Sequence, residues 1–435
     1  MSGDLLVHGG PLLTGDGAWW PRGVVEIREG VVRWCGPEES YPGPAPRHSL
    51  DADGGLILPG LVNAHCHGAM VLFRGLADDL PLREWLTRHI FPAEARWVDE
   101  EMVEVCTLLA AGEMLLAGTT CVGEAYFCAS GAARAYARAG MRAVVAQGVI
   151  DFPAPGVPRP QEALEVARRF LEQWQGAEPL ITPALFAHSP YTCSPETLAG
   201  VAESAREKGV AWFIHLAETS QEVEDVRSRY GATPGRHLES LGLLESLRAA
   251  VHGVWLDARE VRLLARRGVA LVHCPESNLK LASGLGRLAE WLAAGVTVGL
   301  GTDGPASNND LDLWGELATA ARLAKMAARD PAVVPAAQAL EMAWGGSARA
   351  LGLEGVVGRL RPGYAGDLVV LDLAQPHLTP LHHIASTLVY SARGGDVRHV
   401  VVGGRPVVRH RRVLSFDLPA VMENVRRLAR NLART

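Results

Sequence analysis

The chain has 435 residues, of which 48% are apolar and 21% charged, a balance typical of a globular protein with room for one large domain and a smaller one. Its formal net charge of −6 gives no reason to expect nucleic acid or an anionic membrane as a partner. The first residues lack the basic and apolar regions of a signal peptide, and no apolar run is long enough to span a bilayer, so we expect a cytoplasmic location.

Both ends of the chain carry the pattern of short β-strands. Turn signals at Glu29-Gly30 and Gly403-Gly404 separate neighbouring strands of this kind. Because the chain between the two ends has a different pattern, we predict one small β-sandwich domain built from residues 1–58 and 364–415. The expected strands cover residues 5–8, 23–27 and 31–34 near the start, and 367–371, 399–402 and 405–408 near the end.

Residues 59–363 alternate short apolar runs with helical stretches. Eight strands joined by crossover helices predict a (β/α)8 TIM-like barrel, in which the active site lies at the C-terminal ends of the strands. A last unit, residues 416–435, holds an amphipathic, arginine-rich helix. The strand-like runs lie at residues 56–67, 118–124, 141–150, 180–187, 210–215, 249–252, 269–273 and 296–302, with clear helical patterns at 98–117, 161–173 and 195–208.

The first of these runs ends in His65-Cys66-His67. Residues i and i+2 of a strand point to the same face, so the two imidazoles project together and Cys66 turns away. Two imidazoles at one strand end suit a divalent metal. The other strand ends carry further polar residues, namely Glu124, His188, His215, His252, His273 and Asp303.

We predict that four of these residues form a metal site, namely His65, His67, His215 and Asp303. Three neutral imidazoles and one carboxylate suit zinc or ferrous iron, and such a metal lowers the pKa of a bound water. Asp303 is then placed both to bind the metal and to accept the proton of that water.

Two further residues complete the predicted chemistry. Glu218, three residues after His215, is placed to carry a proton to the substrate, and His252 is placed to hold the attacking oxygen or to stabilise an oxyanion. Each residue alone also fits a structural role, since Glu218 suits the first turn of a helix and Asp303-Gly304 is a common turn. Their joint placement at the strand ends of one barrel favours the catalytic interpretation.

Longer motifs cover almost the whole chain. They are Pro-Gly-Leu-Val-Asn-Ala-His-Cys-His at 59–67, residues 74–86 and 92–97, His-Ser-Pro-Tyr at 188–191, His-Leu-Ala-Glu-Thr at 215–219, and residues 273–281 and 301–309. On these motifs the chain resembles the amidohydrolase superfamily and, more closely, the methylthioadenosine/S-adenosylhomocysteine deaminase family. The resemblance implies a barrel with a composite β-sandwich and the hydrolytic deamination of an adenosine-type nucleoside.

The resemblance also implies roles for individual residues. It makes His65, His67, His215 and Asp303 the ligands of one divalent metal, most simply Zn²⁺ with Fe²⁺ as the alternative. It makes Glu218 the proton shuttle at the purine ring, His252 the neighbour of the attacking water and Glu94 the residue that binds the ribose hydroxyls. It places His188, Ser307 and Trp85 around the nucleoside, and leaves open whether His273 is structural.

One position departs from the family pattern. Some relatives that accept S-adenosylhomocysteine carry an arginine on the third strand for the amino-acid carboxylate. The matching residue here is Gln147, whose neutral amide cannot form a charged pair of hydrogen bonds with a carboxylate. Arg159 in the following loop is a candidate substitute, from its own or a neighbouring subunit, and we expect a homo-oligomer. The fourth strand has no lysine to share between two metals, which favours one ion.

Two other functions compete with nucleoside deamination. A related hydrolase of guanine or of an amino- or chloro-triazine would use the same metal site, but the stretch around Glu94 and residues 304–308 favour a nucleoside. A non-catalytic scaffold is disfavoured because such relatives usually lose metal ligands, and all four predicted ligands and Glu218 are present here.

Overall fold

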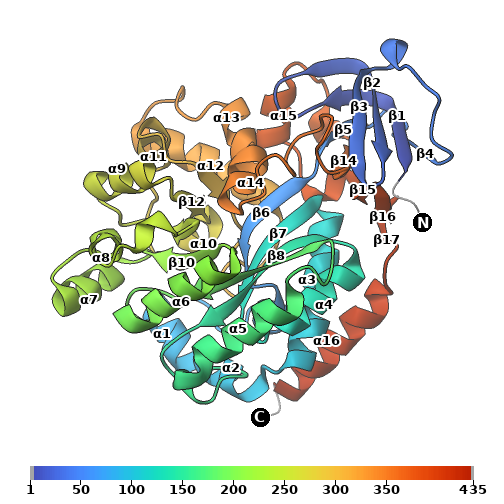
Figure 1. Ribbon diagram of the computed structural model, residues 1–435. Helices are drawn as coiled ribbons and strands as arrows, with labels where there is room; N and C mark the ends of the chain where they lie inside the picture. Colours follow the sequence, from blue (N-terminus) through green and yellow to red (C-terminus); the bar gives the residue numbers. More distant parts are fainter. Residues whose placement is uncertain (1–3, 433–435) are drawn as a thin grey trace.

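The computed structural model describes residues 4–432 and builds them around two β-sheets, one of eight parallel strands and one of nine strands (Figure 1). The parallel sheet follows the chain order without interruption, so that each strand pairs with the next. Its strands are β6 Leu61–Cys66, β7 Thr119–Tyr126, β8 Arg142–Val149, β9 Ile181–Ala187, β10 Trp212–Leu216, β11 Ala249–His252, β12 Ala270–His273 and β13 Val298–Leu300. The predicted barrel and all eight of its strands are confirmed.

Contacts between the first strand and the segment after the last strand close the barrel. The backbone N–H of Asp303 donates to the carbonyl oxygen of His65 at 3.0 Å. The Asn63 side chain accepts from the backbone N–H of Thr302 at 3.1 Å and donates to its hydroxyl at 2.8 Å. This closure brings two predicted metal ligands, 238 positions apart in the sequence, onto adjacent backbone segments.

Small and branched apolar side chains fill the inside of the barrel, and a larger apolar cluster packs between the strands and the helices. Both clusters are apolar because each parallel strand is covered on both of its faces. The inner residues include Val62, Ala64, Cys121, Ala125, Val144, Ala146, Phe186 and Val251.

Helices cover the outside of the barrel. Local signals set their ends: α6 begins after Ser194, whose hydroxyl accepts from the backbone N–H of Thr197, and stops at Gly209 with φ +65°. The helices are α3 Glu100–Leu116, α4 Ala129–Ala139, α5 Ala163–Trp174, α6 Pro195–Lys208, α7 Ser220–Tyr230, α8 Pro234–Ser240, α9 Ala258–Arg267, α10 Pro275–Lys280, α11 Leu288–Ala293, α12 Leu313–Ala328, α13 Ala336–Glu341, α14 Ser347–Ala350 and α15 Ile384–Tyr390.

The second sheet joins both ends of the chain, as predicted. Its two halves meet where β5 pairs antiparallel with β14 (Figure 1). Asp367, just before β14, also accepts hydrogen bonds from Arg142 of the barrel at 2.8 and 3.2 Å. The strands are β1 Leu5–Leu13, β2 Trp19–Arg28, β3 Val31–Pro37, β4 Ser49–Asp51, β5 Leu56–Pro59, β14 Leu368–Leu371, β15 Val397–Val402, β16 Arg405–Arg409 and β17 Arg412–Val413.

The apolar run that precedes the His-Cys-His motif belongs to both sheets. Its first part is β5 and its second part is β6, so the predicted domain boundary at residue 58 falls inside β5. Gly60 separates them, and a Cβ at this position would lie 2.0 Å from the Thr120 hydroxyl oxygen. Only glycine permits this close approach.

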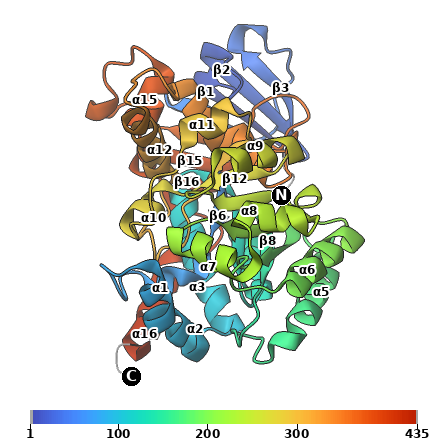
Figure 2. The same cartoon turned by 90° about the vertical axis from the view of Figure 1, so that its left-hand side faces the viewer.

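A segment after the first barrel strand crosses the open end of the barrel. It contains α1 Leu82–Trp85 and α2 Phe91–Trp97 and lies beside α7 and α10 (Figure 2). Two ion pairs tie it there, Lys280 to Asp78 at 2.6 Å and Arg83 to Asp225 at 3.6 Å.

The C-terminal helix α16, Leu418–Leu432, packs against α3 through the buried side chains of Val421 and Val425. Its last predicted residues, from 433 on, lie outside the described residues. Within residues 4–432, no helix is long and apolar enough to cross a membrane.

Candidate active site

The C-terminal ends of the barrel strands open into one cavity of about 840 Å³, including the part that is open to solvent. Its floor holds His67, His215 and Asp303. Beneath them His65 stacks on Phe186, with ring centroids 5.6 Å apart. The walls come from the strand ends and from the α1–α2 segment, so the cavity lies between the barrel and that segment.

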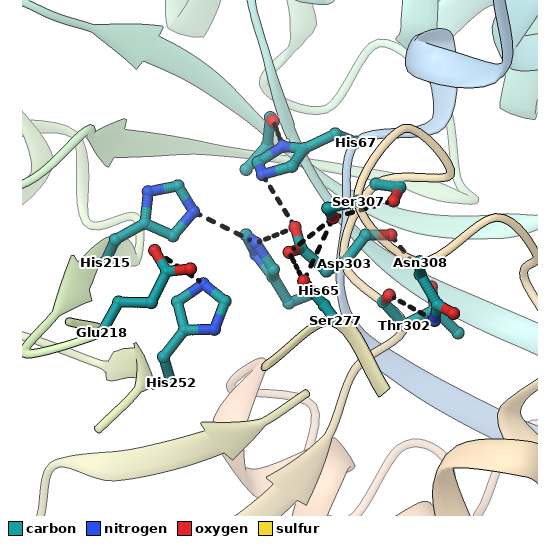
Figure 3. Close-up of polar contacts among 12 residues, drawn as sticks. His65, His67, His215, Glu218, His252, Ser277, Thr302, Asp303, Ser307 and Asn308 are labelled. Carbon is teal, nitrogen blue, oxygen red and sulfur yellow. Dashed lines mark hydrogen bonds and ion pairs between the residues drawn. The ribbon is translucent and has the colours of Figure 1, made fainter. Parts of the chain in front are cut away.

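The four predicted metal ligands point toward one another (Figure 3), and His65 belongs to two close groups, one with His67 and Asp303 and one with His215 and His252. Nε2 of His65 lies 3.2 Å from Nε2 of His215 and 3.5 Å from Oδ1 of Asp303, and Nε2 of His67 lies 3.3 Å from the same oxygen. Two ligands about 2.1 Å from one tetrahedral ion lie about 3.4 Å apart. The spacing and the donor types therefore fit a divalent metal held by these residues.

Burial keeps the imidazoles unprotonated, as metal ligands must be. Burial, reinforced by the proximity of His67, lowers the pKa of His65 to about 4. It also lowers the pKa of His67 and holds that of His215 well below its usual range. Burial alone would raise the pKa of Asp303, but its contacts with His65 and His67 hold this pKa well below the usual range.

Neighbouring groups orient these ligands. The Nδ1 atom of His67 donates to the carbonyl oxygen of Ala125, which can only accept, so the lone pair of the ring lies on Nε2. One oxygen of Asp303, Oδ2, accepts from the hydroxyls of Ser277 at 2.6 Å and Ser307 at 2.9 Å. Its other oxygen, Oδ1, is the one that faces His65 and His67.

Glu218 and His252 lie beside this cluster. Oε2 of Glu218 is 3.7 Å from Nε2 of His252, whose Nδ1 lies 3.0 Å from Oδ1 of Asn278. The buried carboxylate of Glu222 accepts from the backbone N–H groups of Ala217 and Glu218 at 2.7 and 2.8 Å and so fixes the loop. Burial, with the nearby charge of Asp303, raises the pKa of Glu218 to about 8, so this group holds a proton at neutral pH.

A second carboxyl group, that of Glu94 on α2, lines the same cavity and is buried. The hydroxyl of Tyr126, at the end of β7, donates to it at 2.6 Å. The cavity is also lined by His188, Trp85 and Ser307. The indole N–H of Trp85 is already used by the carbonyl oxygen of Ala77 at 3.0 Å.

Comparison with known proteins identifies the family of this chain. Residues 56–407 match the model of the amidohydrolase family. The chain belongs to the amidohydrolase family. It is 47% identical over 432 residues to a 5-methylthioadenosine/S-adenosylhomocysteine deaminase of Syntrophobacter fumaroxidans, covering 99% of this amidohydrolase and 98% of the relative.

Solved structures agree with this assignment. The chain is 39% identical to a zinc-bound adenosine deaminase of Xanthomonas campestris, with a TM-score of 0.96 and 99% of each chain covered. A zinc-bound atrazine chlorohydrolase of Arthrobacter aurescens TC1 has a TM-score of 0.90, with 98% of this amidohydrolase and 100% of that chain covered. At 24% identity the latter likeness shows the fold alone.

The residues that line the cavity of this amidohydrolase do not include Gln147, Arg159 or His273, which were also named from the sequence. The amide of Gln147 is bound to the backbone N–H of Ala129 and to the carbonyl oxygen of Gly148. Arg159 pairs with Glu162 in the loop after β8, and its side chain is 74% exposed. His273 packs edge-on against the Trp291 ring, with centroids 5.3 Å apart. The substrate roles of Gln147 and Arg159 stay predictions.

The structure adds three residues that sequence reasoning did not name. They are Ser277, which binds Asp303, Asn278, which binds His252, and Tyr126, which binds Glu94. Ser277 and Asn278 lie inside a motif that the sequence carries, at 273–281. Tyr126 had a weaker signal, a polar residue two positions after Glu124 at the end of the second barrel strand.

Proposed function

We propose that this amidohydrolase is a metal-dependent deaminase of adenosine-type nucleosides. It converts 5′-methylthioadenosine, 5′-deoxyadenosine or adenosine, and less readily S-adenosylhomocysteine, into the inosine analogue and ammonia. The observation that carries the proposal is one cavity that is lined by metal-ligand candidates, by Glu218 and by the buried carboxyl group of Glu94. The names of the curated relative and of the solved adenosine deaminase support it.

We also propose that His65, His67, His215 and Asp303 hold one divalent metal, most simply zinc. A metal held there lowers the pKa of a bound water and supplies a nucleophile at neutral pH. The bound zinc of the solved relative supports the choice of metal. The absence of lysine from β9 supports a single ion, because two-metal relatives share a modified lysine on that strand.

The side chains then divide the proton transfers. Water adds to the purine carbon that carries the amino group, and ammonia leaves, so the overall reaction consumes one water. Asp303 accepts a proton from the water and returns it to the departing amino group. Glu218, whose pKa burial raises to about 8, donates its proton to the ring nitrogen beside the carbon under attack. It regains a proton from the added hydroxyl as ammonia leaves and the carbonyl of the product forms. His252 lies close enough to Glu218 to orient the oxygen that adds.

The charges of the cavity favour a neutral 5′ group. Among residues 4–432, those that line it include three acidic side chains, Glu94, Glu218 and Asp303, and no lysine or arginine. An amino-acid carboxylate would lose water there without gaining a cation. Apolar residues of the α1–α2 segment, Leu86, Ile90 and Phe91, suit a methyl or methylthio group instead.

A screen for ammonia release tests the function. Metal-loaded protein is given adenosine, 5′-deoxyadenosine, 5′-methylthioadenosine, guanine and an amino-triazine at equal concentrations. We expect turnover of the three nucleosides and none of the free rings, and no turnover by the His65→Ala variant. Preferred turnover of guanine or of the triazine would overturn the proposal. The homo-oligomer, the cytoplasmic location and the domain boundaries expected from the sequence stay predictions.

A further inference from the structure

Tyr126 and Glu94 form a hydrogen-bonded pair inside the cavity, contributed by two different parts of the fold. Tyr126 ends strand β7 of the barrel, and Glu94 belongs to helix α2 of the segment that crosses the open end. Both side chains line the cavity, and each residue is only 5% exposed. The pair therefore joins the crossing segment to the barrel inside the cavity.

The hydrogen bond leaves most of the carboxylate available to a ligand. A phenol donates one proton, and here it goes to Oε1 of Glu94 at 2.6 Å. Among residues 4–432 no other hydrogen bond reaches this carboxylate. Burial raises the pKa of Glu94 to about 7, and the bond from Tyr126 opposes this rise by stabilising the ionised form. Tyr126 thus favours a charged acceptor in a fixed orientation.

The same strand sets the distance between this carboxylate and the metal ligands. The carbonyl oxygen of Ala125 holds the ring of His67, and the next residue, Tyr126, holds Glu94. Two consecutive residues of β7 therefore hold one predicted metal ligand and the Glu94 carboxylate. Elsewhere the crossing segment is tied to the rim by partly exposed ion pairs, such as Lys280 with Asp78, which constrain it less.

We propose that Tyr126 is a positioning residue that aims the Glu94 carboxylate at the vicinal hydroxyls of the ribose and so makes the enzyme selective for ribonucleosides over deoxyribonucleosides. The inference rests on the proposed function, which supplies the nucleoside. A carboxylate accepts hydrogen bonds from two neighbouring hydroxyls only when its plane is fixed, and the phenol fixes one of its oxygens.

The test compares adenosine with 2′,3′-dideoxyadenosine in wild type and in Tyr126→Phe. Hydrogen bonds to a charged group are worth enough that wild type should prefer adenosine in kcat/KM by ~10-fold or more. The preference should fall by most of that factor in Tyr126→Phe. A matched control is Tyr136→Phe, which removes a similar hydrogen bond, to Glu124 at 2.5 Å, from two buried residues that do not line this cavity. The preference should survive in this control.

Two further variants separate the outcomes. In a Glu94→Gln background, Tyr126→Phe should have no further effect on the preference, because its partner charge is gone. If Tyr126→Phe does not fold, Glu94→Asp withdraws the carboxylate from the phenol by one methylene, and the preference should fall there too.

Four results would count against the proposal in different ways. Equal losses of kcat/KM for both nucleosides in Tyr126→Phe, or an unchanged preference in Glu94→Asp, would make Tyr126 merely structural. A wild-type enzyme that deaminates both nucleosides equally would overturn the inference and leave the proposed function intact. A wild-type enzyme that releases no ammonia from either nucleoside or from methylthioadenosine would overturn both.

Discussion

Replacing Glu218 by glutamine should stop most of the turnover and leave the protein folded and metal-loaded. The amide is nearly isosteric with the carboxyl group but does not hold a transferable proton. The backbone of the loop is fixed by Glu222 through the N–H groups of residues 217 and 218, and the substitution leaves these bonds untouched. The metal ligands keep their contacts as well, because Glu218 binds none of them.

The expected magnitude follows from the contacts that the side chain makes. Glu218 accepts one long hydrogen bond, from the Ser283 hydroxyl at 3.4 Å, and lies 3.7 Å from His252. Contacts this weak predict a change in unfolding free energy below ~1 kcal/mol. A positioned proton donor contributes ~10²–10⁴-fold to the rate, which is about 3–5 kcal/mol in the activation barrier. The loss should therefore appear in kcat.

Ammonia release under saturating methylthioadenosine, metal content and thermal midpoint are measured on the same preparation. The matched control is Glu224→Gln, a similar change on helix α7, which follows the Glu218 loop, at a side chain that is 63% exposed. It should retain wild-type turnover. Turnover of Glu218→Gln within about threefold of wild type, with metal retained, would refute the role of Glu218 as proton donor.

Three further predictions follow from the same structure. His65→Ala and Asp303→Ala should each lose bound metal and activity together, and elemental analysis of active wild type should find one equivalent of metal; two equivalents would contradict a mononuclear site. The kcat/KM for methylthioadenosine should exceed that for S-adenosylhomocysteine by ~10-fold or more. The reason is that the cavity offers the amino-acid carboxylate of S-adenosylhomocysteine no charge-assisted hydrogen bond. Arg159→Ala should leave this ratio unchanged, and a ratio that widens in this variant would show that Arg159 binds the carboxylate. Asp367→Ala should lower the unfolding free energy by about 3–5 kcal/mol in urea titrations, because it leaves the buried guanidinium of Arg142 without its carboxylate partner. A loss below about 1 kcal/mol would contradict this account.

The sequence by itself determined the barrel and the identity of the metal-ligand candidates. Eight apolar runs separated by helical stretches have few other ways to bury both faces of a parallel sheet. Residues that follow such runs must gather at one end of the barrel, which is why His215 and Asp303 could be grouped from their positions alone. The two-residue period of a strand likewise put His65 and His67 on one side, and the structure has both rings in the same cluster.

Only the tertiary structure decided how these side chains are partnered and which neighbours reach the cavity. Gln147 lies on a barrel strand and was a reasonable substrate residue, yet its amide turns to the backbone of residues 129 and 148. Little in the sequence marked Tyr126 as a site residue, yet its hydroxyl donates a hydrogen bond to Glu94, which lies on a helix 32 positions earlier. Periodicity fixes the face and the end of a strand on which a residue lies. Whether two side chains meet depends on the rotamers and the packing of segments distant in sequence, and these are settled only when the barrel closes and the crossing segment docks on it.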